Sequence, residues 1–288
     1  MNAEPSPFDR AAEWRDEPEV LDRLRRDAFT RVIVIRDRKA RVENGRLVRV
    51  PAADVAESEW ALLGRDEDGS PLLLAVEPDV ETPIDEAWLG IRDAGGMLDR
   101  FDMDVFIESV ALAGWLDGFG FCPACGTRLE LRQGGWSRHC DNCGAEHFPR
   151  TDPAVIVAVE SADGERLLLG ANASWQGRMY SCFAGFVEAG ESLESTVHRE
   201  LYEEAGIRVD SLRYLSSQPW PYPRSLMLGF RAVVADEEAR ADGEEIIDVR
   251  WLTRPEVASS LRGEGPVGMP GPASIARALI VDWYEERS

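Results

Sequence analysis

Four cysteines, arranged as two CxxC pairs, constrain this chain more than any other feature. Cys122 and Cys125 form the first pair. Cys140 and Cys143 form the second, and a glycine follows each pair directly. Two pairs at this separation can place four thiolates around one tetrahedral zinc ion. Because four thiolates leave no position open for substrate, the expected zinc is structural, one ion per chain, and replaces a core that so short a segment cannot build.

A disulfide pair and a redox CxxC motif are the alternatives for these cysteines. Disulfides are less favoured because residues 1–19 lack the basic start and apolar run of a secretion signal. A redox motif is less favoured because the CxxC pattern occurs twice at zinc-ribbon spacing. His139 and His147 are expected to be surface residues rather than ligands. Cys182, the fifth cysteine, is expected to be a small buried side chain.

The cysteine segment also suggests how the 288 residues divide into domains. Domains commonly hold about 100–200 residues, so a chain of this length favours more than one. We expect a β-rich N-terminal domain over residues 1–118, a short zinc ribbon over residues 119–150 and an α/β domain over residues 151–288.

The expected N-terminal domain carries apolar and alternating runs that are typical of strands. Residues 31–36 and 71–77 predict strands, and residues 41–50 alternate around Asn44-Gly45, a dipeptide that favours a tight hairpin turn. Residues 102–117 predict an amphipathic helix. Its expected buried face consists of Phe106, Val110, Ala113 and Leu116.

The expected C-terminal domain mixes strand and helix patterns. A hairpin is expected around Asp163-Gly164, and Gly206 can end the longest helix. Residues 180–188 predict a strand and a loop, and residues 217–225, with three prolines, predict a stiff loop. The other expected strands are 154–160, 166–170, 208–214, 226–235 and 246–252, and the expected helices are 192–205 and 274–285.

Charge excludes some classes of function. The chain has 32 basic and 53 acidic side chains and a net charge of −21. A negative net charge of this size disfavours a protein that coats nucleic acid or an anionic membrane. An anionic substrate would therefore need a metal ion or converging arginines. No apolar stretch of the sequence approaches the roughly 18 residues of a membrane span, and a cytoplasmic location is expected.

Three glutamates on one predicted helix carry the strongest functional signal. Glu200, Glu203 and Glu204 stand at positions i, i+3 and i+4, so their carboxylates crowd one helix face. Like charges this close repel, and a hard cation such as Mg²⁺ or Mn²⁺ removes the conflict by taking oxygen ligands. The alternative is a solvated acidic face. Five further residues weigh against it: Gly185, Gly190, Glu191, Arg199 and Gly206.

Together these residues follow one motif from Gly185 to Ile207. The order is glycine, five residues, glutamate, seven residues, Arg-Glu, an aliphatic, one residue, Glu-Glu, one residue, glycine and an aliphatic. This pattern resembles the Nudix box. The resemblance implies an α/β/α sandwich in which a loop, a helix and a loop hold a divalent metal against a nucleoside diphosphate linked to another moiety.

A narrower resemblance covers the chain from about residue 110 to its end. Residues 217–225, SQPWPYPRS, are similar to the SQPWPFPxS array of NADH pyrophosphatases, with Tyr222 in place of the usual phenylalanine. The cysteine segment and residues 112–116 and 147–156 resemble the same family. The chain is therefore similar to the NADH pyrophosphatase (NudC-like) family of the Nudix superfamily.

This resemblance implies hydrolysis of the central diphosphate of NADH or NAD⁺ to NMN(H) and AMP. The expected ligands of the catalytic Mg²⁺ or Mn²⁺ are Glu200, Glu203 and Glu204. Arg199 is expected to orient these carboxylates rather than to contact phosphate. Glu245 is expected to assist in metal binding or to act as base.

The resemblance also implies a set of substrate-binding residues. Phe186 and Trp220 are expected to line the part of the pocket that holds the nicotinamide ring. Ser225 and Ala276 are expected to border the same pocket. Gln218 belongs to the same proline-rich array and is expected to bind substrate. The family further implies a homodimer with both chains near the pocket.

Three alternatives stay open at this stage. The same site could remove NAD caps from RNA 5′ ends. A Nudix hydrolase for ADP-ribose or dinucleoside polyphosphates is less favoured because of the Trp-Pro array. A non-enzymatic protein with a zinc ribbon and an inactive Nudix fold is disfavoured because the whole carboxylate set is intact.

Overall fold

The computed structural model describes residues 5–56, 58–78, 85–235 and 238–286. Contacts divide the chain into two compact units. Within the described residues, the N-terminal unit consists of residues up to 151 together with 221–224, and the C-terminal unit of residues 152–220 and those from 225 onward. No helix within these ranges combines the length and the apolar character that crossing a bilayer requires.

A four-stranded sheet with helices on both faces forms the N-terminal unit's core. Its elements are α1 (Val20–Arg25), β1 (Arg31–Ile35), β4 (Val50–Pro51), β5 (Glu59–Arg65), β6 (Pro71–Val76) and α3 (Arg100–Gly118). The strand order is β4-β1-β6-β5, with β1 parallel to β6 and the other pairs antiparallel. Residues of α3 join the core on one face, whereas Val20 and Leu24 of α1 pack on the other.

The predicted face of α3 is confirmed, since Phe106, Val110, Ala113 and Leu116 are all buried. The helix begins after Asp99, whose side chain accepts a hydrogen bond from the Asp102 N–H, as a good N-cap does. Strand β5 and helix α1 are absent from the sequence-based expectations.

The Asn44-Gly45 hairpin is also confirmed. It joins β2 (Ala40–Glu43) to β3 (Arg46–Leu47), with Val42 opposite Leu47. Asn44 and Gly45 both adopt left-handed conformations, with φ of 51° and 73°, as a two-residue turn of this kind requires. Strand β7 (Trp88–Leu89) pairs with β2, and the short helix α2 (Ile91–Ala94) follows it.

The cysteine segment forms a small sheet of its own in the order β10-β9-β8. These strands are β8 (Glu130–Arg132), β9 (Ser137–His139) and β10 (Glu146–His147). Short 3-10 helices are present at Ala12–Trp14, Ala52–Asp54, Gln133–Gly135 and Ala173–Trp175. The 3-10 helix Gln133–Gly135, between β8 and β9, packs on β5, since a Cβ on Gly135 would lie 2.5 Å from the Ala61 Cβ.

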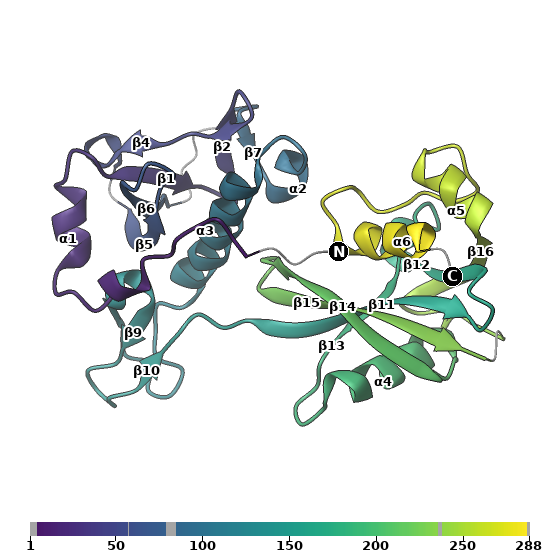
Figure 1. The fold of residues 1–288 in the computed structure, drawn as a ribbon. Coiled ribbons are helices and arrows are strands. Elements are labelled where there is room, and N and C mark those ends of the chain that lie inside the picture. Colours follow the sequence, from purple (N-terminus) through teal and green to yellow (C-terminus); the bar gives the residue numbers. More distant parts are fainter. Residues whose placement is uncertain (1–4, 57, 79–84, 236–237, 287–288) are drawn as a thin grey trace. The chain divides into compact units, whose positions relative to one another are not determined.

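The C-terminal unit is an α/β/α sandwich. Its elements are β11 (Asp152–Ser161), β12 (Arg166–Asn172), β13 (Phe183–Phe186), α4 (Leu193–Ala205), β14 (Ser211–Trp220), β15 (Ser225–Val234), β16 (Ile246–Thr253), α5 (Arg254–Leu261) and α6 (Ile275–Glu285). The sheet order is β14-β15-β11-β12-β16, and β13 pairs with β11. Helices α4 and α6 lie on opposite faces of this sheet (Figure 1), and each covers a separate apolar cluster.

Residues 217–225 are not the loop that the prolines predict. Strand β14 begins at Ser211 and runs through Trp220, with Gln218 opposite Met227 and Pro219 opposite Leu226. Proline lacks the N–H of a ladder bond, but β14 is an edge strand, where proline is tolerated. The prediction of a strand over 208–214 was therefore too early and too short, and only residues 221–224 form the connection.

Glu108 is a buried acid on α3. Its side chain is 2% exposed, and Arg10 Nε lies 2.9 Å from Glu108 Oε2. Burial raises the pKa of Glu108 from 4.5 to about 7, and the positive charges of Arg10 and Arg15 offset only part of this effect. The folded chain therefore binds a proton at Glu108 more tightly than the unfolded chain does.

We predict that Glu108 makes the protein less stable as the pH rises from 5 to 8. A carboxyl with a raised pKa in the folded state contributes its full stability below the unfolded pKa, and this contribution is lost as the pH passes through the folded value. The loss is about 3 kcal/mol at most. Glu108→Gln should flatten this dependence in urea denaturation and unfold at higher urea than the parent at pH 8. The same pH dependence in both proteins would contradict the prediction.

Candidate functional site

Capping residues set the limits of α4, the helix that carries the box glutamates. The Ser192 Oγ accepts a hydrogen bond from the Ser195 N–H at 3.2 Å. Gly206 ends the helix in the left-handed conformation, at φ 68°. Between them, Val197 and Leu201 are fully buried against the sheet. The register of the box glutamates is therefore fixed by caps and by an apolar face together.

Arg199 holds the carboxylates of the box in place. Its Nε donates to Glu191 Oε1 at 2.8 Å, and its Nη1 donates to Glu200 Oε1 at 2.8 Å and to Glu203 Oε2 at 3.0 Å. Its Nη2 donates to the Phe186 carbonyl at 2.9 Å. The hydrogen bond from Arg199 is the main reason why the pKa of Glu191 is held at about 2. These contacts suit the orienting role predicted for Arg199.

Glu204 is the box residue with the least compensated charge. It is 4% exposed, and its Oε2 has no hydrogen-bond partner. Burial and then the negative charges of Glu245, Glu200 and Asp242 raise the pKa of Glu204 to about 8, against a small opposing effect of the Ala184 N–H. A buried carboxylate without a partner is costly, and a bound cation would remove that cost.

Gly185 makes room for Glu200. A Cβ at position 185 would lie 1.9 Å from Glu200 Cδ, so any other residue would displace the carboxylate. Gly185 lies on β13 opposite Val155 of β11. The first glycine of the box is therefore required by close packing, and the sequence pattern alone does not reveal this reason.

Glu245 lies in the turn that leads into β16. Its carbonyl accepts from the Ala173 N–H at 2.8 Å, and its Oε1 accepts from Asn172 Nδ2 at 3.5 Å. Asp242 Oδ1 shapes this turn by accepting from the Ile246 N–H at 2.9 Å. The contribution of Asp242 to the charge around Glu204 was missed from the sequence, where its only signal is a place in an acidic run.

The donor chemistry of this site fits a divalent cation. Burial and the negative charges of Glu203 and Glu245 raise the pKa of Glu200, and the charges of Glu245 and Glu200 act in the same direction on buried Glu204. Carboxylate oxygens are the ligands that Mg²⁺ and Mn²⁺ prefer. Glu203 is 57% exposed and turned toward Arg199. Among the residues described, however, the oxygens do not converge as tightly as the cysteine sulfurs, which alone form a cluster of potential ligands within 4.8 Å.

Four of the predicted substrate-binding residues lie near one another beside α6. Gln218 Oε1 accepts from the Ile275 N–H at 2.8 Å. Ala276 is buried in the first turn of that helix. Trp220 lies two residues beyond Gln218 on β14, directly opposite Ser225 on β15. The structure therefore groups these residues on neighbouring strands and one helix.

Phe186 lies apart from this group and is linked to the box carboxylates through Arg199. Its side chain is 54% exposed, while its carbonyl is held by Arg199. Strand pairing aligns Phe186 with Ala154, Met227 and Gln218 in one row across the sheet. At about 4.8 Å per strand, Phe186 lies about 14 Å from Gln218. A ligand that contacts both must be elongated.

Two matching turns hold the four cysteines. The Gly126 N–H donates to the Cys122 carbonyl and the Gly144 N–H to the Cys140 carbonyl, each at 2.8 Å. Both glycines are left-handed, with φ of 74° and 73°. The glycine after each CxxC pair is therefore needed for the backbone conformation that turns both cysteines toward one point.

The cysteine sulfurs form a compact group that suits zinc. All four Sγ atoms lie within 4.8 Å of one another. Cys122 and Cys143 are 3.7 Å apart, and Cys125 and Cys140 are 3.4 Å apart. A tetrahedral site with Zn–S bonds of about 2.3 Å separates its sulfurs by about 3.8 Å. His147 lies beside this group, with Nε2 3.6 Å from Cys122 Sγ.

Cys182 is buried, as predicted, in the C-terminal unit. It is 7% exposed, and its Sγ lies 3.8 Å from the Ala276 carbonyl. Burial raises the pKa of its thiol to about 12. A thiol with this pKa is a poor nucleophile at neutral pH.

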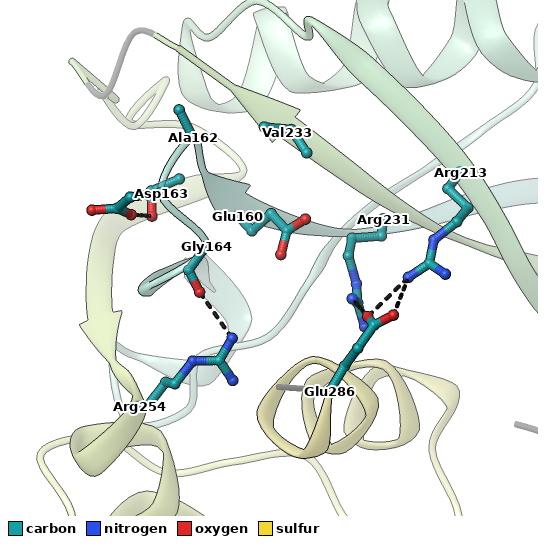
Figure 2. A pocket seen from close by; sticks show the side chains of 10 residues that line it. Glu160, Ala162, Asp163, Gly164, Arg213, Arg231, Val233, Arg254 and Glu286 are labelled. Carbon is teal, nitrogen blue, oxygen red and sulfur yellow. Dashed lines mark hydrogen bonds and ion pairs between the residues drawn. The ribbon is translucent and has the colours of Figure 1, made fainter. Parts of the chain in front are cut away.

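A cavity of about 390 Å³ lies near the end of β11 that is remote from Ala154 (Figure 2). Arg213 and Arg231 both bind the Glu286 carboxylate just after α6. Arg254 Nη2 donates to the Gly164 carbonyl at 2.9 Å. None of the residues predicted for the active site is among those that line this cavity. Its arginines instead fix the end of α6 to the sheet.

Comparison with known proteins decides the family. Residues 119–148 match the NADH pyrophosphatase zinc ribbon domain, and residues 150–268 match the NUDIX domain. Over 274 residues the chain is 38% identical to the NAD-capped RNA hydrolase NudC of Mycobacterium bovis, which covers 90% of this chain and 85% of that protein. The chain belongs to the NudC-like family of Nudix hydrolases. The predicted family, fold class and enzyme class are therefore confirmed.

Other relatives match smaller parts. The human NAD-capped RNA hydrolase NUDT12 is 36% identical over 196 residues, which are 65% of this chain and 42% of that protein. The solved structure of a NUDIX hydrolase from Nitrosomonas europaea aligns with a TM-score of 0.42 at 22% identity, over 52% of this chain and 97% of the other.

The zinc ribbon yields a direct prediction. Cys140→Ser should lower the zinc content of the purified protein from about one ion per chain to well under that, because a tetrahedral site loses one of its four ligands. The variant should also unfold at a lower temperature. Cys182→Ser is the matched control, because it changes a buried cysteine outside the ribbon and should leave the zinc content unchanged. Atomic emission measures the metal, and a full zinc ion in Cys140→Ser would contradict the assignment.

Proposed function

We propose that this NudC-like hydrolase cleaves the diphosphate of NADH or NAD⁺ and releases NMN(H) and AMP. Glu204 carries the proposal, because it is a buried carboxylate whose Oε2 lacks a hydrogen-bond partner amid the charges of Glu200, Glu245 and Asp242. Such a site favours a divalent cation. When bound, the cation neutralises phosphate oxygens and lowers the pKa of a water molecule that can attack phosphorus.

The proposed cation is Mg²⁺ or Mn²⁺, and its proposed ligands are Glu200, Glu203, Glu204 and Glu245. Glu203 is mostly exposed, so it can turn from Arg199 toward an ion with little change in packing. Arg199 keeps its bonds to Glu191 and to the Phe186 carbonyl and so preserves the shape of the loop. Glu245 is the proposed fourth ligand or base assistant because its charge acts on Glu204.

An elongated substrate suits the positions of the proposed binding residues. Phe186 offers an exposed ring at the position whose carbonyl Arg199 binds, and the indole of Trp220 is proposed for the nicotinamide side. Gln218, Ser225 and Ala276 border the site along β14, β15 and α6. The row of about 14 Å from Phe186 to Gln218 favours a dinucleotide over a smaller ligand.

Removal of NAD caps from RNA is the second proposed activity. Relatives from Mycobacterium bovis and human are named NAD-capped RNA hydrolases, and the chemistry of cap removal is the same diphosphate cleavage. The division into domains at 1–118, 119–150 and 151–288 is also a proposal, supported by the two family matches. The homodimer and the cytoplasmic location remain predictions.

Loss of Glu204 tests the catalytic proposal. The purified protein with Mg²⁺ or Mn²⁺ should release AMP from NADH. Glu204→Gln should lower kcat/KM more than about a hundredfold, because even residues that only support metal ligands cost 10–100-fold when changed. Its folding should be preserved, because the amide keeps the size of the carboxyl and burial already disfavours the charged form of Glu204. Glu194→Gln, on the exposed first turn of α4, is the matched control. Activity of Glu204→Gln within tenfold of the parent would remove the proposed metal role.

Substrate comparison tests the second activity. The protein should release NMN from a short NAD-capped RNA as well as NMNH from free NADH, and should act more slowly on ADP-ribose. Turnover of the capped RNA should decrease more with added salt than turnover of NADH, because each phosphate contact releases counterions. Liquid chromatography of the products at several salt concentrations measures both. A preference for ADP-ribose over both substrates would contradict the proposed specificity.

A further inference from the structure

The cavity in Figure 2 brings three guanidinium groups together beside the end of α6. They belong to Arg213 of β14, Arg231 of β15 and Arg254, the first residue of α5. Strand pairing places Arg213 directly opposite Arg231. Like charges in directly opposite positions destabilise a sheet, so this pair needs an anion between its members. All three arginines belong to the C-terminal unit.

Glu286 supplies that anion. It directly follows α6, and Arg213 Nη2 donates to its Oε1 at 3.1 Å and to its Oε2 at 2.9 Å. Arg231 Nη1 donates to the same Oε2. The Glu286 side chain is 46% exposed, so it can rotate into water without disturbing the apolar core. Glu286 therefore occupies a position between two arginines that another anion can take.

Arg231 retains a donor that the carboxylates do not use. It is 6% exposed, and its Nε has no hydrogen-bond partner, whereas its Nη2 donates to Asp282 of α6. Burial lowers the pKa of Arg231, an effect that Glu160 and Asp282 partly offset. The positive charges of Arg213 and Arg254 act in the same direction as burial. A buried donor without a partner is costly, and an anion with a third acceptor oxygen would remove this cost.

Arg254 is held by groups that carry no net charge. Its Nη2 donates to the Gly164 carbonyl and its Nη1 to the Trp283 carbonyl, each at 2.9 Å. Its guanidinium also lies 4.4 Å from the centroid of the Trp283 ring. These contacts fix the guanidinium without cancelling its positive charge, which adds to the attraction of the cavity for anions.

Two further acids line the cavity and oppose this attraction. Asp163 is held in its own turn, where its Oδ1 accepts from the backbone N–H two residues on at 3.0 Å. Figure 2 shows its carboxylate turned away from the arginines of β14 and β15. Glu160 is the acid whose charge acts most on Arg231. When Glu286 leaves, the three arginines face Glu160 and Asp282, and one positive charge remains.

We propose that this cavity binds a phosphate monoester, whose phosphate group replaces the Glu286 carboxylate between Arg213 and Arg231. A phosphate has more acceptor oxygens than a carboxylate, so it can accept from the Arg231 Nε as well as from the Nη donors of both arginines. The volume of about 390 Å³ lies in the range of small-molecule pockets, which leaves room for the organic part of the ester. Asp282 keeps Arg231 attached to α6 when the ligand is bound. This inference does not depend on the proposed function.

Calorimetric titration with ribose 5-phosphate tests the inference on the full-length, zinc-loaded protein without added Mg²⁺ or Mn²⁺. This probe has a phosphate monoester but neither a nucleobase nor a diphosphate, and it should bind at one site per chain. Arg213→Gln should weaken binding at least about tenfold, because it removes charged hydrogen bonds to the phosphate. Arg262→Gln is the matched control. It changes an arginine that is 61% exposed and does not line the cavity, so the dissociation constant should stay within twofold of the parent.

Glu286→Gln gives a result that a purely structural role does not predict. A neutral amide competes less well than a carboxylate for the two guanidinium groups, so ribose 5-phosphate should bind about tenfold more tightly than to the parent. The variant should melt at a lower temperature without ligand, and the ligand should raise its melting temperature more than that of the parent. Glu264→Gln, at an exposed acid outside the cavity, is the matched control and should show neither change.

Several outcomes would overturn the inference. Unchanged affinity in Arg213→Gln would show that the phosphate binds elsewhere, and weaker binding to Glu286→Gln would show that Glu286 does not occupy the position of the ligand. Binding of succinate within twofold of ribose 5-phosphate would remove phosphate as the recognised group. Inorganic phosphate that binds as tightly as ribose 5-phosphate would remove the ester as the ligand. None of these results changes the expected hydrolysis of NADH, so the two proposals fail separately.

Discussion

The proposed metal site depends on crowding of acidic side chains against one strand of the sheet. Glu200 packs directly over Gly185, and Glu204 is buried beside β13 with part of its carboxylate unpaired. The sandwich can hold these charges because Arg199 binds the carboxylates of Glu191, Glu200 and Glu203 and also the Phe186 carbonyl. Three features bring the acidic side chains together. They are the register of α4, the absence of a Cβ at position 185 and the position of β16. Without a cation, it is a costly place for charge.

The C-terminal unit and the zinc ribbon obtain their stability in different ways. The C-terminal unit buries apolar clusters on both faces of a sheet, with α4 on one side and α6 on the other. The zinc ribbon has only a very small apolar cluster, so its shape depends on four thiolates and two left-handed glycines. It also packs on β5, where Trp136 bonds to the Leu62 carbonyl. That contact explains why the ribbon belongs to the N-terminal unit.

Helix α6 connects several features of the C-terminal unit. At its start, the Ile275 N–H is bound by Gln218 and Ala276 is buried. At its end, Arg231 binds Asp282 and Glu286. The arginine cavity in Figure 2 is therefore a structural clamp at one end of a helix whose other end borders the proposed substrate site. A helix held at both ends keeps Gln218 in a fixed orientation.

The sequence by itself determined the features that depend on local spacing. The two CxxC pairs, the capped helix α4, the Asn44-Gly45 turn and the box motif each follow from the conformations of a few consecutive residues. Local signals also existed for an element that was missed, because Thr253 and Glu256 form a capping box at α5 with Pro255 in the first turn. Only the tertiary structure decided features that depend on distant partners. Pro219 lies in a strand because β14 is at an edge. Glu204 is buried because α4 packs on the sheet, and Arg15 lies over Trp136 because the ribbon packs on β5. Proximity between segments that are far apart in the sequence leaves no periodic trace in the chain, because such a trace reports only which face of one element is apolar.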